Sequence, residues 1–87
     1  MYTLGAVMMS TWIKIEPAQN CYRFYAISLA QDLFNDYVVS AEWGRIGTKR
    51  YRRKVVVFDS KIDAVAYVEQ LEQLRLKHHY QSPLGNA

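Results

Sequence analysis

The sequence predicts an α+β fold in which an antiparallel sheet of four or five strands, connected as a meander, packs against one long C-terminal helix. Two observations indicate this class. Four segments with the alternation or the aromatic and β-branched content of strands follow one another, joined by short polar connections. After the fourth segment, the apolar residues change to the three- and four-residue spacing of an amphipathic helix.

The predicted strands cover residues 11–16, 21–29, 37–43 and 52–58. In the first, Ile13 and Ile15 alternate with polar or amphipathic neighbours, as in a half-buried strand. The second and third are rich in aromatic and branched side chains. The fourth ends in VVVF, which is apolar on both faces, so we expect this half of the strand to be covered on both sides.

The helix prediction begins at Ser60, because Ser60 and Asp63 are spaced like a capping box. Six residues at helical spacing form the predicted stripe against the sheet: Ala64, Tyr67, Val68, Leu71, Leu74 and His78. We expect residues 1–8 to be a loose N-terminal extension, residues 9–80 to form the domain, and residues 81–87 to be a disordered tail.

Charge is distributed unevenly along the 87 residues, which is a length typical of one small domain. The net charge is +3, but all six charged residues between Trp43 and Phe58 are basic. The rest of the chain holds five basic and eight acidic residues and is therefore negative. This distribution predicts a partner with negative charge at the basic segment.

Motifs for catalysis, cofactors and metals are missing from the sequence. There is no glycine-rich nucleotide-binding signature and no zinc-protease motif. His78 and His79 are adjacent at the predicted helix end, where they point in different directions, and Cys21 is the single cysteine. We therefore expect no enzyme activity, no metal, no cofactor and no membrane association, and a reducing, cytoplasmic compartment.

The basic segment has two interpretations. Lysine and arginine on a solvated edge strand discourage aggregation between sheets. Alternatively, the segment binds phosphates, and the excess of arginine over lysine favours this interpretation because the guanidinium fork suits bidentate phosphate contacts. Arg52 and Lys54 alternate with Arg53, so the strand start is expected to protrude into solvent, with Tyr51 as a stacking surface.

Trp43 also has two interpretations. By alternation it shares a face with Tyr37, Val39 and Ala41, which is typical of a core residue. It is also the last residue before Gly44, where the predicted strand ends, so its ring can rest on the sheet and still meet solvent. The periodicity of the sequence leaves both interpretations of Trp43 open.

The hexapeptide WGRIGT at residues 43–48 resembles the signature of the WGR domain, which occurs in poly(ADP-ribose) polymerases and in many bacterial proteins. Asn20 just before the second strand, Phe24 and Tyr25 within it, and Ser60 and Ala64 at the helix start also resemble the family pattern. The resemblance extends from Trp12 to Tyr80. It departs from the family at residues 49–53, where KRYRR replaces a frequent Gly-Gln, and at His79.

The resemblance implies a WGR-like fold and a non-catalytic module that binds nucleic acid, DNA in preference to RNA, at ends or strand breaks, as in DNA repair. It implies that Trp43 stacks on a terminal nucleotide and that Arg45 contacts phosphate or an adjoining loop. The expected binding residues are Trp43, Gly44, Arg45, Lys49, Arg50, Tyr51, Arg52, Arg53 and Lys54. The alternative is a protein-interaction module that docks onto a partner such as a DNA-processing enzyme.

Overall fold

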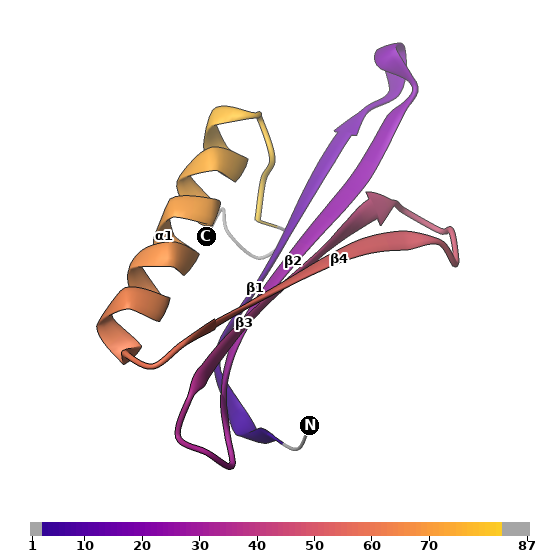
Figure 1. Cartoon of the computed structure of the whole chain (residues 1–87). Coiled ribbons are helices and arrows are strands. Elements are labelled where there is room, and N and C mark those ends of the chain that lie inside the picture. The colour runs from indigo at the N-terminus through magenta and orange to yellow at the C-terminus, as the bar shows by residue number, and fades with distance from the viewer. Residues whose placement is uncertain (1–2, 83–87) are drawn as a thin grey trace.

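The computed structural model describes residues 3–82 of the chain, with side chains from residue 8 onward. Four antiparallel strands lie in the order β1-β2-β3-β4 and are followed by one helix (Figure 1). The elements are β1 (Thr3–Glu16), a short 3-10 turn (Pro17–Gln19), β2 (Cys21–Asp32), β3 (Tyr37–Arg45), β4 (Tyr51–Phe58) and α1 (Lys61–Lys77). The predicted α+β meander with a C-terminal helix is confirmed.

The two ends of the described chain differ from our expectation. Thr3 to Met8 were expected to form a loose extension but continue β1, paired with the end of β2 across two irregularities in the register. The extra length of β2, which runs to Asp32, supplies the partner for these residues. Gln81 exchanges two backbone hydrogen bonds with Ile13, at 2.8 and 2.7 Å. The rest of the predicted tail, 83–87, lies outside the described residues.

The β2–β3 turn is organised by Asp32. Its buried carboxylate accepts hydrogen bonds from the backbone N–H groups of Phe34 and Asp36, at 2.9 and 3.0 Å. An aspartate that bonds backbone groups two and four residues ahead closes such a turn and satisfies its own buried oxygen.

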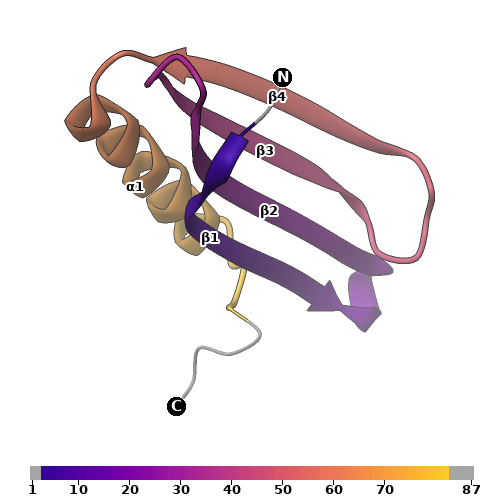
Figure 2. The same ribbon diagram turned by 90° about the horizontal axis from the view of Figure 1, so that it is seen from below.

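The core lies between α1 and one face of the sheet, so the molecule has two layers (Figure 2). The largest fully buried side chains are Ile27, Leu29 and Val39 from the sheet and Val68 from the helix. Ser60 begins the helix as predicted, and its hydroxyl accepts a hydrogen bond from the Asp63 backbone N–H at 3.3 Å. Within the described part of the chain, no helix is long and apolar enough to cross a membrane.

The apolar stripe of α1 is shorter than predicted. Ala64 and Val68 are buried, but Leu74 and His78 are exposed. In the last turns, Arg75 faces the sheet instead, and its guanidinium lies 4.0 Å from the ring centroid of Tyr25. The aromatic rings at this end of the sheet can accept a cation on their faces, so an arginine replaces the expected leucine contact.

The prediction that VVVF is covered on both sides is wrong. Val56 and Phe58 face the helix side and are half-buried, whereas Val55 and Val57 are 46% and 50% exposed on the opposite face. The helix α1 covers one face of the sheet, and these two valines lie on the other face.

Candidate nucleic-acid interface

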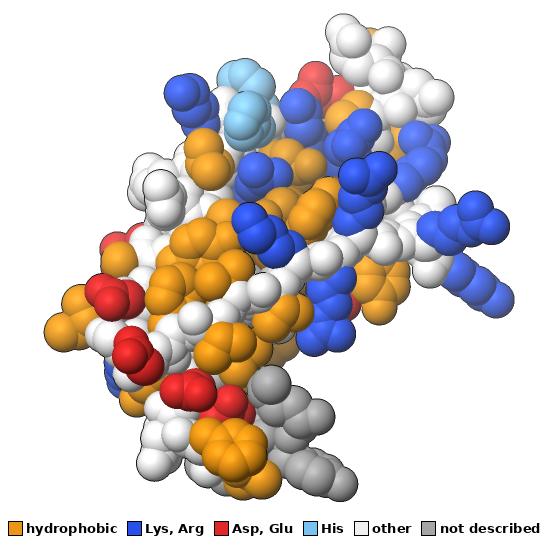
Figure 3. Space-filling model, in the orientation of Figure 1, with side chains coloured by type: hydrophobic (Ala, Val, Ile, Leu, Met, Phe, Trp, Pro, Cys, Tyr) orange, Lys and Arg blue, Asp and Glu red, His pale blue; other side chains and the backbone are white. Residues whose placement is uncertain are grey.

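One end of the sheet extends beyond α1 and carries both the β1–β2 turn and the β3–β4 turn (Figure 1). Lysine and arginine side chains gather at this end of the molecule (Figure 3). The first five residues of β4, Tyr51 to Val55, are all exposed. The prediction that the basic end of this hairpin protrudes into solvent is confirmed.

The β3–β4 turn is held by Gly47 and Thr48. Gly47 has φ +86°, a left-handed conformation that residues with a Cβ adopt only with strain. The Thr48 hydroxyl lies 3.1 Å from the Arg45 carbonyl oxygen and 2.8 Å from that of Arg50, and it can donate to either. These contacts fix the path of the chain between the two strands and therefore the position of the basic residues that follow.

Gly44 lies directly opposite Tyr51 across the β3–β4 pair. A Cβ at this position would meet the Tyr51 Cβ at 3.2 Å and Cα at 3.3 Å, and the Arg50 carbonyl oxygen at 3.4 Å. These distances are tighter than ordinary van der Waals contact. A glycine therefore lets the start of β4 approach β3 closely beside Trp43. The predicted strand end before Gly44 is wrong, because β3 continues through Gly44 to Arg45.

Trp43 lies partly in the core and partly at the surface, so each of the two interpretations of the sequence holds in part. It packs against the core cluster, and its ring stacks on Tyr25 with the centroids 5.6 Å apart and the planes inclined by 15°. It is half-buried rather than sealed. Tyr25 is itself buried, and burial raises the pKa of its hydroxyl while the charge of Arg75 opposes that rise.

The uncovered part of Trp43 borders a hollow of about 470 Å³ that we call the Trp43 hollow. Its other lining residues are Arg23, Gly44, Arg50, Tyr51 and Arg52. Arg52 is the direct cross-strand neighbour of Trp43. An aromatic wall and three guanidinium groups thus surround one cavity. Such a cavity can hold a flat or sugar-like group against the ring and an anion against the arginines.

Arg45 faces a second, adjacent hollow of about 310 Å³, which we call the Arg45 hollow. Its lining residues are Gln19, Asn20, Cys21, Tyr22, Arg23, Gly44 and Arg45. The Arg45 guanidinium donates to the backbone oxygen and to Oδ1 of Asn20, both at 3.4 Å, and lies 5.4 Å from the ring centroid of Tyr22. Arg45 therefore joins the β3 end to the β1–β2 turn and keeps further N–H donors free for a ligand.

The sheet register brings Arg23, which the sequence analysis missed, to both hollows, and places Lys14 beside it. Arg23 lies directly opposite Arg45 on one side and Lys14 on the other. This cation row is adjacent to an aromatic row formed by Trp12, Tyr25 and Trp43. Arg23 alternates with Tyr25 in β2 and so shares its face, but the pairing of β2 with β3 is needed to place it beside Arg45.

Like charges placed directly opposite each other are unfavourable in a sheet unless an opposite charge offsets them. Lys14 is paired with Glu16 at 3.7 Å, but no ion pair is found for Arg23 or Arg45 among the described residues. The two guanidinium groups are both exposed. Their arrangement leaves a position for an anion from outside the chain.

The remaining predicted binding residues do not line the Trp43 hollow. Lys54 shares the face of Arg52 but lies one row further along, opposite Ala41. Arg53 points to the other face, beside Glu42, and Lys49 lies in the turn. All three are exposed. Of the nine predicted residues, five converge on the Trp43 hollow, Arg45 borders the neighbouring one, and these three contribute positive charge at the periphery.

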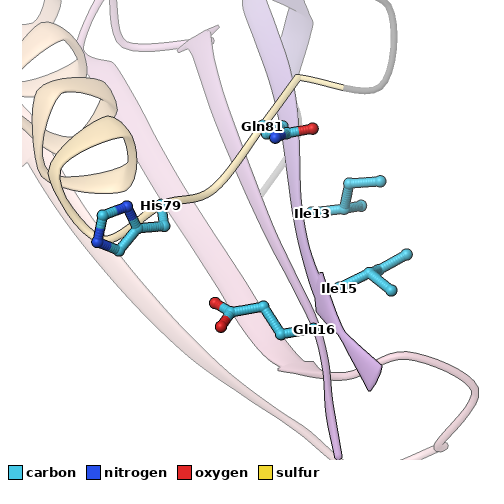
Figure 4. Close-up of a pocket in the computed structure, with 5 residues that line it drawn as sticks. All are labelled: Ile13, Ile15, Glu16, His79 and Gln81. Carbon is cyan, nitrogen blue, oxygen red and sulfur yellow. The ribbon is translucent and has the colours of Figure 1, made fainter. Parts of the chain in front are cut away.

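A larger hollow, of about 560 Å³, lies at the edge of β1 and offers little chemistry. Ile13 and Ile15 point to one side of the strand, and Glu16 points to the side on which His79 lies (Figure 4). No serine, threonine, cysteine or lysine lines this hollow. In the part of the chain that the structure describes, no group of three histidine, cysteine, aspartate or glutamate residues could hold a metal ion.

The fold and the basic, aromatic end of the sheet define a small α+β binding domain. The WGR domain family matches residues 8–86, and the chain therefore belongs to this family, whose domains generally act as nucleic-acid-binding modules rather than as catalysts. The chain is also 35% identical over 71 residues to an uncharacterized protein, y4dW, from Sinorhizobium fredii. The matched segment is 80% of this chain and 34% of that relative, so the chain spans about a third of the relative's length.

Proposed function

We propose that this domain binds DNA at an end or a strand break. In this proposal a terminal nucleotide occupies the Trp43 hollow, and its sugar or base rests on the indole. The adjoining phosphates contact Arg23, Arg50 and Arg52, while Lys49, Arg53 and Lys54 attract the rest of the backbone. The domain catalyses no reaction and recruits or marks the DNA end for another protein.

The convergence of Trp43 with three arginines around one hollow is the observation that carries this proposal. A surface for continuous duplex needs only positive charge along the backbone, because phosphates supply most of the affinity. An aromatic face presented beside cations suits an unstacked or terminal nucleotide, since only such a nucleotide exposes a flat surface for stacking. The volume of the Trp43 hollow is typical of a small-ligand site. It therefore suits one terminal nucleotide better than a continuous DNA duplex.

The test compares two DNA molecules that differ only in their ends. One is a 5′-phosphorylated blunt duplex with a fluorescent label on an internal base, and the other has the same sequence and label but is closed by a hairpin loop at each end. We expect the open duplex to bind about tenfold more tightly at the same salt concentration. A ratio of this size is the free energy expected from one terminal nucleotide that stacks on Trp43 and contacts the site through its phosphate.

Equal affinity for the open and closed duplexes would contradict end binding and leave a module that binds DNA through charge alone. A single-stranded oligonucleotide of the same length provides the third arm, because its bases are also free to stack. Absence of binding to all three at low salt would instead favour the protein-interaction alternative. A pull-down that survives nuclease treatment would then be its positive evidence.

A further inference from the structure

β4 is an edge strand with an unpaired outer side. Within residues 3–82, β3 is the strand that pairs with β4, and no other strand lies on its far side. Its pairing with β3 runs without interruption from Tyr51 to Phe58, so no bulge bends this edge away. The opposite edge of the sheet differs, because Gln81 bonds to both backbone groups of Ile13 in β1.

The two halves of β4 differ in how they are protected. Arg52, Arg53 and Lys54 place charge on the first half, which discourages another strand from pairing there. The second half is VVVF and has no charged residue, proline or bulge. Val55 and Val57 leave about half of their surface in water. An exposed apolar edge of this kind is a template for a further strand.

We propose that a second copy of this chain covers the edge, with the two β4 strands paired antiparallel about a twofold axis at Val56. In this register, Val55 of each copy lies opposite Val57 of the other. Arg53 of each copy lies opposite Asp59 of the other. The two four-stranded sheets thus become one sheet of eight strands, with both helices on the same face.

Charge complementarity selects this register. A twofold axis at Val55 would place Arg53 opposite a valine, and an axis at Val57 would place Val55 opposite Asp59. On the outer face, the axis at Val56 pairs Val55 with Val57 and Arg53 with Asp59, each twice. On the helix face, it places Lys54 of each copy opposite Phe58 of the other. Asp59 directly follows β4, at the bend that leads to α1, and Ser60 after it is extended, with φ −120° and ψ 129°, so Asp59 lies next to the strand end that pairs in this register.

The charge distribution of the whole face supports the antiparallel arrangement. Lysine and arginine gather at the end of the molecule that carries the β3–β4 turn, and most acidic side chains visible in this view lie toward the other end (Figure 3). Antiparallel pairing of two copies places the basic end of each beside the acidic end of the other. Parallel pairing would place like charges side by side.

Sedimentation velocity of the full chain without nucleic acid tests this proposal, over about 10 to 500 μM because pairing of one strand edge buries a small interface. We expect a monomer–dimer equilibrium in this range. Val57→Lys should abolish the dimer, since a lysine would then lie opposite Val55 of the second copy. Met9→Lys is the matched control: Met9 is exposed on the same face at the other edge of the sheet, and this variant should dimerise like the wild type.

Charge exchange tests the register itself. Arg53→Asp and Asp59→Arg should each weaken self-association about tenfold or more, because each places like charges opposite one another twice in the dimer. An equimolar mixture of the two variants should associate at least as well as the wild type, because both cross-strand pairs are then oppositely charged. Circular dichroism shows whether each variant is folded, and if Arg53→Asp is not, Val57→Lys and Asp59→Arg carry the test.

A wild-type chain that stays monomeric up to the highest concentration would overturn the proposal, as would a dimer that Met9→Lys disrupts and Val57→Lys does not. A dimer sensitive to Val57→Lys whose single charge variants are not rescued on mixing would exclude the register centred on Val56.

Discussion

Trp43 packs against the core and, in the proposed function, also contacts the terminal nucleotide, so its replacement should affect stability and affinity together. Trp43→Ala removes the stack on Tyr25 and part of the core contact. We expect a loss of about 2 kcal/mol in the free energy of unfolding, less than for a fully buried tryptophan. The affinity for an open duplex should fall by about 1–3 kcal/mol, the usual worth of a stacking contact. Thermal melting and fluorescence anisotropy measure the two effects.

Trp12→Ala is the matched control for this variant. Trp12 lies in the same aromatic row on the other side of Tyr25, is also half-buried against the core, and does not line the Trp43 hollow. It should lose similar stability and keep its affinity. If the two variants lose affinity equally, the effect of Trp43 on binding is general destabilisation rather than contact with the nucleotide.

Gly47 permits a second test at single-residue scale. No heavy atom lies within 4 Å of a Cβ built there, so the cost of a side chain comes from the positive φ alone. Gly47→Ala should reduce the free energy of unfolding by about 1 kcal/mol, and Gly47→Asn by less, because asparagine tolerates the left-handed region. Urea denaturation compares the two. Equal costs would show that the turn can relax to another conformation.

At the scale of the elements, the site depends on how strands pair. Arg23 in β2 and Arg45 in β3 become neighbours through the register of the sheet, 22 positions apart in the chain. Arg23→Gln should weaken DNA binding about five- to tenfold, because a charge-assisted phosphate contact is lost at the centre of the site. Lys61→Gln removes the same charge at the exposed start of α1, away from both hollows, and should change affinity little. Equal effects of the two would mean that net charge alone governs binding.

The elements themselves could largely be predicted from local pattern. Alternation placed the strands, Gly47 placed the turn, and Ser60 with Asp63 placed the helix start, whereas Gly44, expected to end β3, lies within it. Contacts between elements could not be predicted in the same way. Arg23 was missed because its partner lies in another strand, and Leu74 was wrongly placed in the core because periodicity cannot show that Arg75 reaches the Tyr25 ring. The exposure of Val55 and Val57 depends on what covers the sheet, which an apolar run does not reveal.

At the scale of the whole molecule, positive charge is concentrated at one end of the sheet while the net charge is only +3. Binding should therefore depend on salt more steeply than that net charge suggests. If three to five cations contact phosphates, the logarithm of affinity for duplex DNA should fall with the logarithm of salt concentration with a slope of about −2.7 to −4.5. Titrations at several salt concentrations give the slope, and Arg23→Gln should reduce its magnitude by about 1. A slope near zero would contradict phosphate binding.

The motif identified the Trp43 end of the sheet, and the fold explains why its parts converge there. Trp43 lies near the end of β3, Gly44 after it lets β4 approach closely, and Arg45, the last residue of β3, reaches to Asn20 in the β1–β2 turn. Sequence spacing could indicate that an aromatic ring and cations belong to one site. It could not show that they divide between two adjoining hollows, because side-chain direction at a strand end is set by tertiary contacts.

The most direct test of the central claim uses the fluorescence of Trp43 itself. In a Trp12→Phe background, Trp43 is the single tryptophan. We expect titration with the open 5′-phosphorylated duplex to quench its emission saturably, at the concentrations at which anisotropy reports binding, and the closed duplex to leave the emission nearly unchanged. Binding detected by anisotropy with no change in Trp43 emission would contradict the account, because the nucleic acid would then occupy some surface other than the Trp43 hollow.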